Sequence, residues 1–175
     1  MSRGVTTTVR SYDYVNHGYA AVREALRSDP LGIFQRATTV AARRAGEIDA
    51  QLHARVGPID VAADVAIEVT SIVEEAQSSP ARQPATRLEL AWRAVRRPEM
   101  FPVMHAVLSI YPLTSTETQL ELEGTYDPPA GVVGRAFDAV AGHRIAEASV
   151  QKFVQEVAAG LRGELARPAS REEAT

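Results

Sequence analysis

The sequence predicts an α+β fold in which a curved antiparallel sheet wraps around a long C-terminal helix. Three observations indicate this fold. A segment with a strand pattern comes first and is followed by two segments with a helical pattern. A run of segments with two-residue alternation comes next, and their short connections favour antiparallel pairing. The last long segment has a helical repeat, so the sheet would close over it and enclose an interior.

The first elements are a strand and two helices. Residues 5–15 are rich in β-branched and aromatic side chains, which is typical of a strand. A first helix is expected at about residues 18–27. A second should begin at Asp29 and Pro30, because Asp is a favoured N-cap and Pro is favoured at the first helical position. Gly46 is expected to end this helix near residue 45.

The hydrophobic period then changes from 3.6 to 2 residues. In residues 47–56 apolar and polar side chains alternate, so we expect a strand with one dry and one wet face. Gly57 and Pro58 would turn the chain into a second strand at 61–70. Residues 76–86 contain Ser, Gln and Pro and are expected to form a loop.

Three more strands and a long helix complete the predicted fold. The strands are expected at about 88–94, 103–111 and 119–126, and the helix from about residue 131 to 167. A helix of that length would extend for about 50 Å. In its second half the apolar stripe consists of Val150, Val154, Val157 and Leu161. Residues 1–167 should therefore form one domain, and the polar residues 168–175 a disordered tail.

A charged side chain interrupts the apolar stripe in the first half of this helix. Arg144 lies within the stripe, and Glu147 lies beside it at helical spacing. A charge in that position needs a partner or water. Two interpretations stay open: a polar patch that lines a cavity, or an ion pair at the rim of the core that points outward.

Composition excludes several classes of function. The chain has no Cys, so it has no disulfide or thiolate chemistry. The net charge of -3, with no basic run, argues against a nucleic-acid partner. We expect no signal peptide and no membrane insertion, because no h-region precedes residue 14 and no apolar stretch approaches ~18 residues. A cytoplasmic, bacterial protein is therefore expected, the latter because the chain is rich in Ala and Arg.

Known catalytic and cofactor motifs are missing from the sequence. The four His residues lack metal-ligand spacing, and there is no nucleophile elbow and no phosphate-binding loop. We therefore expect no metal and no cofactor. His105 could act as a base if its strand face pointed inward, but the apolar alternation favours the outer face.

Three stretches carry a resemblance to a known family. They are FPVMHAVLSIYPL (101–113), TQLELEGTYDPPAG (118–131) and GHRIAEASVQKFVQEVA (142–158). With the order of elements from residue 5 to 165, they resemble bacterial proteins of the START-like superfamily, which includes polyketide cyclases, Bet v 1-type allergens and lipid-transfer domains. The resemblance implies a helix-grip fold, with two short helices after the first strand. It implies no specific reaction, because the functions within this fold diverge widely.

The leading functional hypothesis is that the chain binds or carries a small hydrophobic ligand, lipid- or polyketide-like, in a cavity between the sheet and the last helix. The expected lining is apolar except for one Arg that would orient a polar end of the ligand: Phe34, Leu90, Trp92, Met104, Leu108, Leu120, Phe137, Ala141 and Arg144.

Two alternatives stay open. A polyketide cyclase or aromatase would use the same cavity, with Arg144, Glu147 and His105 as weak catalytic candidates. A protein-interaction module would use an edge strand or the segment 96–102. A homodimer is compatible with the sequence, but no residues specify it.

Overall fold

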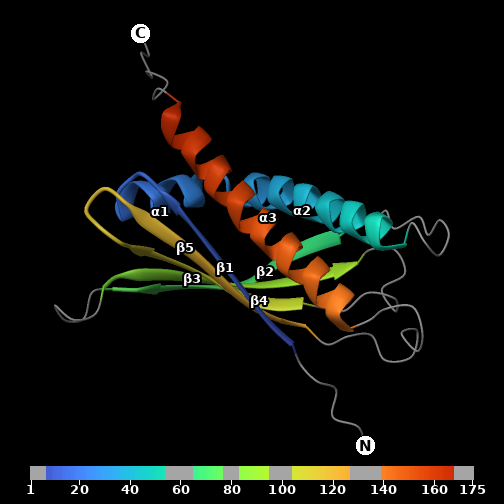
Figure 1. Ribbon diagram of the computed structural model, residues 1–175. Coiled ribbons are helices and arrows are strands. Elements are labelled where there is room, and N and C mark those ends of the chain that lie inside the picture. Colours follow the sequence, from blue (N-terminus) through green and yellow to red (C-terminus); the bar gives the residue numbers. More distant parts are fainter. Residues whose placement is uncertain (1–6, 54–64, 77–82, 95–103, 127–138, 168–175) are drawn as a thin grey trace, which may run out of the picture.

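A five-stranded antiparallel sheet and three helices form the fold (Figure 1). The computed structural model describes residues 7–53, 65–76, 83–94, 104–126 and 139–167. In chain order the elements are β1 (Thr7–Val15), α1 (Tyr19–Ser28), α2 (Pro30–His53), β2 (Val65–Glu75), β3 (Ala85–Ala94), β4 (Met104–Pro112), β5 (Thr118–Tyr126) and α3 (Ala139–Ala166).

The sheet has the strand order β1-β5-β4-β3-β2, and every neighbouring pair is antiparallel. The first strand therefore lies beside the last one, and β1 and β2 form the two edges. The three helices lie on one face of the curved sheet (Figure 1). This arrangement confirms the predicted helix-grip fold, in which the sheet curves around the C-terminal helix.

Local signals in the sequence explain several element boundaries. α2 begins at Pro30, as predicted, and Asp29 caps it by accepting a hydrogen bond from the backbone N–H of Gly32 (2.9 Å). The turn between β4 and β5 is closed by the backbone N–H of Leu113, which donates to the carbonyl of Glu117 (2.8 Å). That turn lies between the strands expected at 103–111 and 119–126.

The predicted strand at 47–56 is wrong for its described part. α2 continues without interruption to His53, so Gly46 does not end it. Ile48 and Leu52 are four residues apart and fit a helical face as well as an alternating one. Ala50 and Gln51, which lie between them, favour a helix, and one internal Gly costs only about 1 kcal/mol. The described sheet therefore has fewer strands than the sequence indicated, and β2 is the next described element after α2.

The core lies between the inner face of the sheet and the helices. α3 packs along α2 on one side and along β1 on the other. Its predicted stripe is buried: Val150, Val154, Val157 and Leu161. Arg162 links α3 to the edge strand β1, because its guanidinium donates to Asp13 Oδ1 (3.1 Å) and to the carbonyl of Tyr14. None of the helices in the described ranges is long and apolar enough to cross a membrane.

Candidate functional site

The inner face of the sheet is closed in one half and open in the other. In the closed half, the apolar side chains of β3, β4 and β5 are at most 1 % exposed: Leu88, Leu108, Ile110, Leu120 and Leu122. Toward the other end, Ile67, Trp92 and Met104 are only partly buried. The strand register places these three side by side across β2, β3 and β4, and we call them the open row. Large apolar side chains thus remain accessible on a face that the helices cover.

Next to the open row, two paired strands carry very little side-chain bulk. Ala106 of β4 is paired with Gly124 of β5. A Cβ added to Gly124 would lie 3.1 Å from the Ala106 Cβ and 3.4 Å from Met104 Sδ. A glycine inside a strand often marks a place where another group approaches the backbone closely. This small pair is therefore closely packed, and the side chain of Met104 lies beside it.

Three aromatic rings connect the sheet to both long helices. Phe34 of α2 stacks on Phe153 of α3, with ring centroids 6.1 Å apart. Trp92 of the open row meets Phe153 edge to face, with centroids 5.0 Å apart. Both arrangements are favourable for aromatic pairs. The contacts among these rings set the distance between β3 and the helices α2 and α3 beside Trp92 of the open row.

Among the described residues, the buried side chains with a polar group are three threonines and Tyr126. Thr86 is hydrogen-bonded to the hydroxyl of Tyr19 (2.7 Å), and Thr118 donates to the carbonyl of His17 (2.8 Å). Thr38 of α2 has no hydrogen-bond partner for its Oγ1 within the described part of the protein. An interior of this kind can desolvate an apolar molecule, and its buried titratable group is the phenol of Tyr126, which is paired with Met104.

The predicted lining residues fall into four groups. Phe34, Leu90, Leu108 and Leu120 are buried in the core, and Trp92 and Met104 belong to the open row. Phe137 lies outside the described residues, and Ala141 is described only by its place in α3. Arg144 is exposed on α3. The structure thus brings the apolar members together and leaves Arg144 at the surface.

The three weak catalytic candidates are not assembled in the described structure. Glu147 is exposed, and its Oε1 lies 3.1 Å from Nε2 of His143, one turn earlier on α3. His105 is exposed on the outer face of the sheet, the orientation that the alternation favoured. It therefore lies on the face of the sheet opposite to α3. No cluster of metal-ligating side chains occurs among the described residues.

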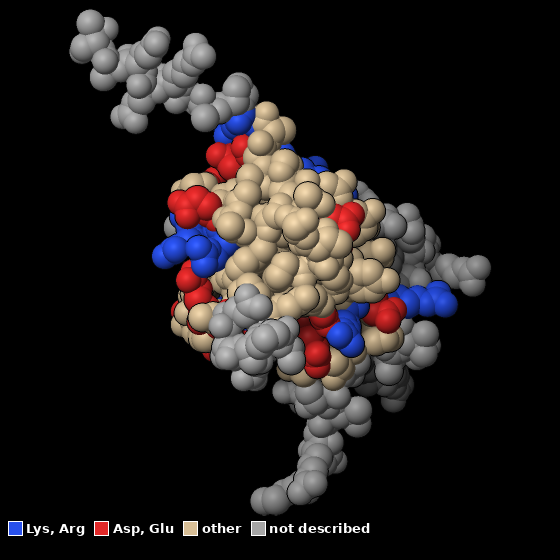
Figure 2. Space-filling view, turned by 90° about the vertical axis from the view of Figure 1, so that its left-hand side faces the viewer, with Lys and Arg blue, Asp and Glu red and all other residues tan. Residues whose placement is uncertain are grey.

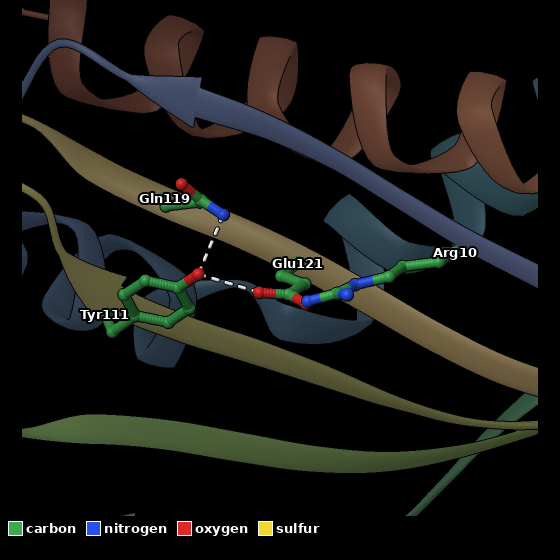
Figure 3. Close-up of polar contacts among 4 residues, drawn as sticks. All are labelled: Arg10, Tyr111, Gln119 and Glu121. Atoms are coloured by element: carbon green, nitrogen blue, oxygen red, sulfur yellow. Dashed lines mark hydrogen bonds and ion pairs between the residues drawn. The ribbon is translucent and has the colours of Figure 1, made fainter.

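A polar cluster occupies the outer face of β1, β4 and β5 (Figure 3). The Tyr111 hydroxyl donates to Glu121 Oε2 and accepts from Gln119 Nε2, both at 2.7 Å, and Arg10 Nε donates to Glu121 Oε1 at 2.6 Å. The hydrogen bond from Tyr111, with those from Arg10, lowers the pKa of Glu121. Burial, with the bond to Glu121, raises the pKa of Tyr111. The cluster connects three strands on the solvent side and faces away from the open row.

Exposed apolar side chains occur at separate places on the surface. Tyr12 and Tyr14 lie on the edge strand β1, Ile72 and Val73 on the edge strand β2, and Leu113 in the turn between β4 and β5. Figure 2 shows the end of the molecule that carries α1, where uncharged residues occupy the centre and charged ones lie mainly at the rim. Nothing among these surface residues indicates a particular partner for an interaction module.

Sequence reasoning missed Thr38, Ile67, Ala106 and Gly124 as members of the site. For two of them, Thr38 and Gly124, the sequence did contain a signal. Thr38 is a polar residue at helical spacing from Phe34, and Gly124 interrupts an apolar row within a strand. No pattern marked Ala106, because a small apolar residue is equally common in a filled core.

Comparison with known proteins finds likeness of structure but not of sequence. No protein-family profile matches the sequence, and no curated protein is similar to it. Similar solved structures include Ara h 8.0201, with 9 % identity, a TM-score of 0.42 and coverage of 91 % of this chain and 97 % of that one. The Zhui aromatase/cyclase from Streptomyces sp. R1128 has 18 % identity, a TM-score of 0.44 and coverage of 91 % and 93 %.

A third similar structure is the protein TTHA0849 from Thermus thermophilus, with 10 % identity, a TM-score of 0.43 and coverage of 91 % of this chain and 97 % of that one. These likenesses transfer no ligand and no reaction to this chain.

Proposed function

We propose that this protein binds a small hydrophobic ligand between the inner face of its sheet and helices α2 and α3. The supporting observation is the contrast within one sheet face. The side chains of the closed half are sealed from solvent, whereas Ile67, Trp92 and Met104 remain partly exposed under the helices. Covering such apolar surface is favourable by about 25 cal/mol per Å² before the costs of association. A ligand in contact with the open row would gain this energy.

The ligand class follows from the lining. Aromatic and aliphatic side chains dominate it, and the paired residues Ala106 and Gly124 beside the open row carry little side-chain bulk. A flat ring system or an acyl chain, polyketide- or lipid-like, suits such a surface. Arg144 is exposed on the first part of α3 and could pair with an acidic end of a ligand at the surface.

The interior favours binding over catalysis. A cyclase that moves protons needs at least two polar groups directed at the same substrate. In the described interior the buried side chains with a polar group are three threonines, whose hydroxyls do not titrate near neutral pH, and Tyr126, a single phenol. Arg144, Glu147 and His105 are all exposed. The carrier is therefore the function we propose, and no observation favours the cyclase.

Trp92 provides the test, because it is the only tryptophan of the chain and belongs to the open row. Titration with the tricyclic hydrocarbon fluorene should change the Trp92 emission in a saturable manner, and calorimetry should give the same Kd. Native mass spectrometry with a panel of lipids and polyketides should then identify a retained ligand.

A matched control uses the outer face of the sheet. In a Trp92→Phe, Val107→Trp variant, the new tryptophan lies on the outer face, so its emission should not respond although calorimetry still detects binding. If wild-type emission and heat are unchanged by fluorene and by every member of the panel, the proposed function is wrong.

A further inference from the structure

Thr38 is buried in an unusual state for a polar side chain. It is 4 % exposed, and its Oγ1 finds no hydrogen-bond partner in the described part of the protein. Thr86 and Thr118 are equally buried, and both are hydrogen-bonded. Buried polar groups are almost always paired, so an unpaired one requires an explanation. A partner that is not part of the chain is one such explanation.

The position of Thr38 on α2 points it toward the proposed site. Ile33 marks the side of α2 that meets α3, because a Cβ added to Gly160 would lie 3.5 Å from Ile33 Cγ2. At 3.6 residues per turn, Thr38 is rotated by about 140° from Ile33 and by only about 40° from Phe34. Phe34 belongs to the aromatic group that reaches Trp92 through Phe153. Thr38 lies one turn beyond Phe34, and α2 also packs against β2, which carries Ile67 of the open row.

We propose that the Thr38 hydroxyl forms a hydrogen bond with an oxygen of the bound ligand, so that the ligand is an apolar molecule with a carbonyl or hydroxyl group in its body and not a pure hydrocarbon. This inference rests on the proposed function. A hydroxyl both donates and accepts, so it can pair with either kind of oxygen. A site that hydrogen-bonds an oxygen discriminates against the analogue without it, because the buried group is then left unpaired.

Two rigid probes of the same shape test the proposal. Fluorenone differs from fluorene by a single carbonyl, and both can be titrated by calorimetry. The wild type should bind fluorenone about 5- to 10-fold more tightly than fluorene, the ratio that one net hydrogen bond provides. Thr38→Val keeps the shape of the side chain and should remove this preference, chiefly by weakening fluorenone. Thr38→Ser retains the hydroxyl and should keep the preference.

The control is Thr86→Val, which removes a buried hydroxyl of similar exposure that is already bonded to Tyr19. It should keep the preference for fluorenone. The ligand-free proteins provide a second readout. Thr38→Val should raise the thermal midpoint because it removes an unpaired buried group, whereas Thr86→Val should lower the midpoint because it leaves Tyr19 unpaired.

The outcomes separate this inference from the proposed function. If both probes bind and Thr38→Val keeps the wild-type preference, or if Thr38→Val lowers the thermal midpoint, the hydroxyl is satisfied within the protein and the inference is wrong while the carrier function stands. If neither probe binds to the wild type, this inference fails, and if no member of the lipid and polyketide panel binds either, the carrier function fails as well.

Discussion

The substitution Ala106→Leu distinguishes an interior that accepts a guest from one that its own side chains fill. Leucine adds three carbon atoms to a residue that is 5 % exposed and paired with Gly124, which has no side chain. Carbon atoms that enter unfilled apolar space gain about 0.8 kcal/mol each, or about 2.4 kcal/mol in total. Ordering the leucine side chain costs about 0.5–1 kcal/mol. If the proposed ligand space lies beside Ala106, the free energy of unfolding should therefore rise by about 1.5 kcal/mol.

A filled core gives the opposite sign. Extra methylene groups in a well-packed interior cost about 1–3 kcal/mol, because neighbouring side chains are forced from their rotamers. The two cases thus differ by about 2.5–4.5 kcal/mol, which urea unfolding resolves easily when the slope with denaturant stays constant. If the site is where we propose it, Ala106→Leu should also weaken fluorene binding at least about tenfold, since the added side chain occupies the place of the ligand.

The matched control is Val107→Leu, the next residue of β4, which points to the outer face and is 36 % exposed. It should change neither stability nor binding by a measurable amount. Should Ala106→Leu lose more than about 1 kcal/mol of stability and still bind fluorene as the wild type does, the space beside Gly124 is already filled, and the ligand site cannot be there.

Two further substitutions test the sheet itself. Gly124→Ala should destabilise the protein by about 1 kcal/mol in urea unfolding, because the new Cβ meets a rigid neighbour at 3.1 Å, and this outweighs the smaller gain from a less flexible unfolded chain. An unchanged or higher stability would show that the strands separate freely at this pair. Tyr111→Phe should flatten the pH dependence of stability at both ends. Because the pKa of Glu121 is lowered in the folded protein, its carboxylate stabilises the fold above the ordinary value of 4.5, and this stabilisation is lost as acid protonates the folded carboxylate. Because the pKa of Tyr111 is raised, stability falls above pH 10, where the unfolded phenol ionises. Thermal unfolding from pH 3 to 11 measures this, and the account would be contradicted if the wild type and Tyr111→Phe lost the same stability toward acid and toward alkaline pH.

The order of elements was predictable because each one has a strong local signal. Asp29 and Pro30 begin α2 by chemistry that is independent of the rest of the chain. The alternation in β4 and β5 assigns each side chain to a face, since a shift by one residue would bury Glu121 and Glu123. Residues 47–53 lacked such a signal, because Ile48 and Leu52 satisfy both periods and only the continuation of α2 decides between them.

The site was less predictable than the fold for a different reason. Spacing identifies which side chains face inward, but it does not show how completely they are covered. Leu108 and Met104 lie on the same face of β4, yet Leu108 is sealed and Met104 belongs to the open row. That difference depends on which helix turns lie above each residue, and so on contacts between segments far apart in the chain. Arg144 is a second example: helical spacing put it in an apolar stripe and left both an inward and an outward orientation open, and the structure exposes it.

The division of the sheet also separates stability from recognition. The closed half holds side chains such as Leu108 and Leu120 at full burial, where truncation to alanine costs about 2–5 kcal/mol. Partly exposed side chains such as Ile67 and Met104 have less burial to lose, so changes in the open row should cost less stability. The open row can therefore vary to suit different ligands while the closed half keeps the chain folded. A protein organised in this way can change what it binds without first rebuilding its core.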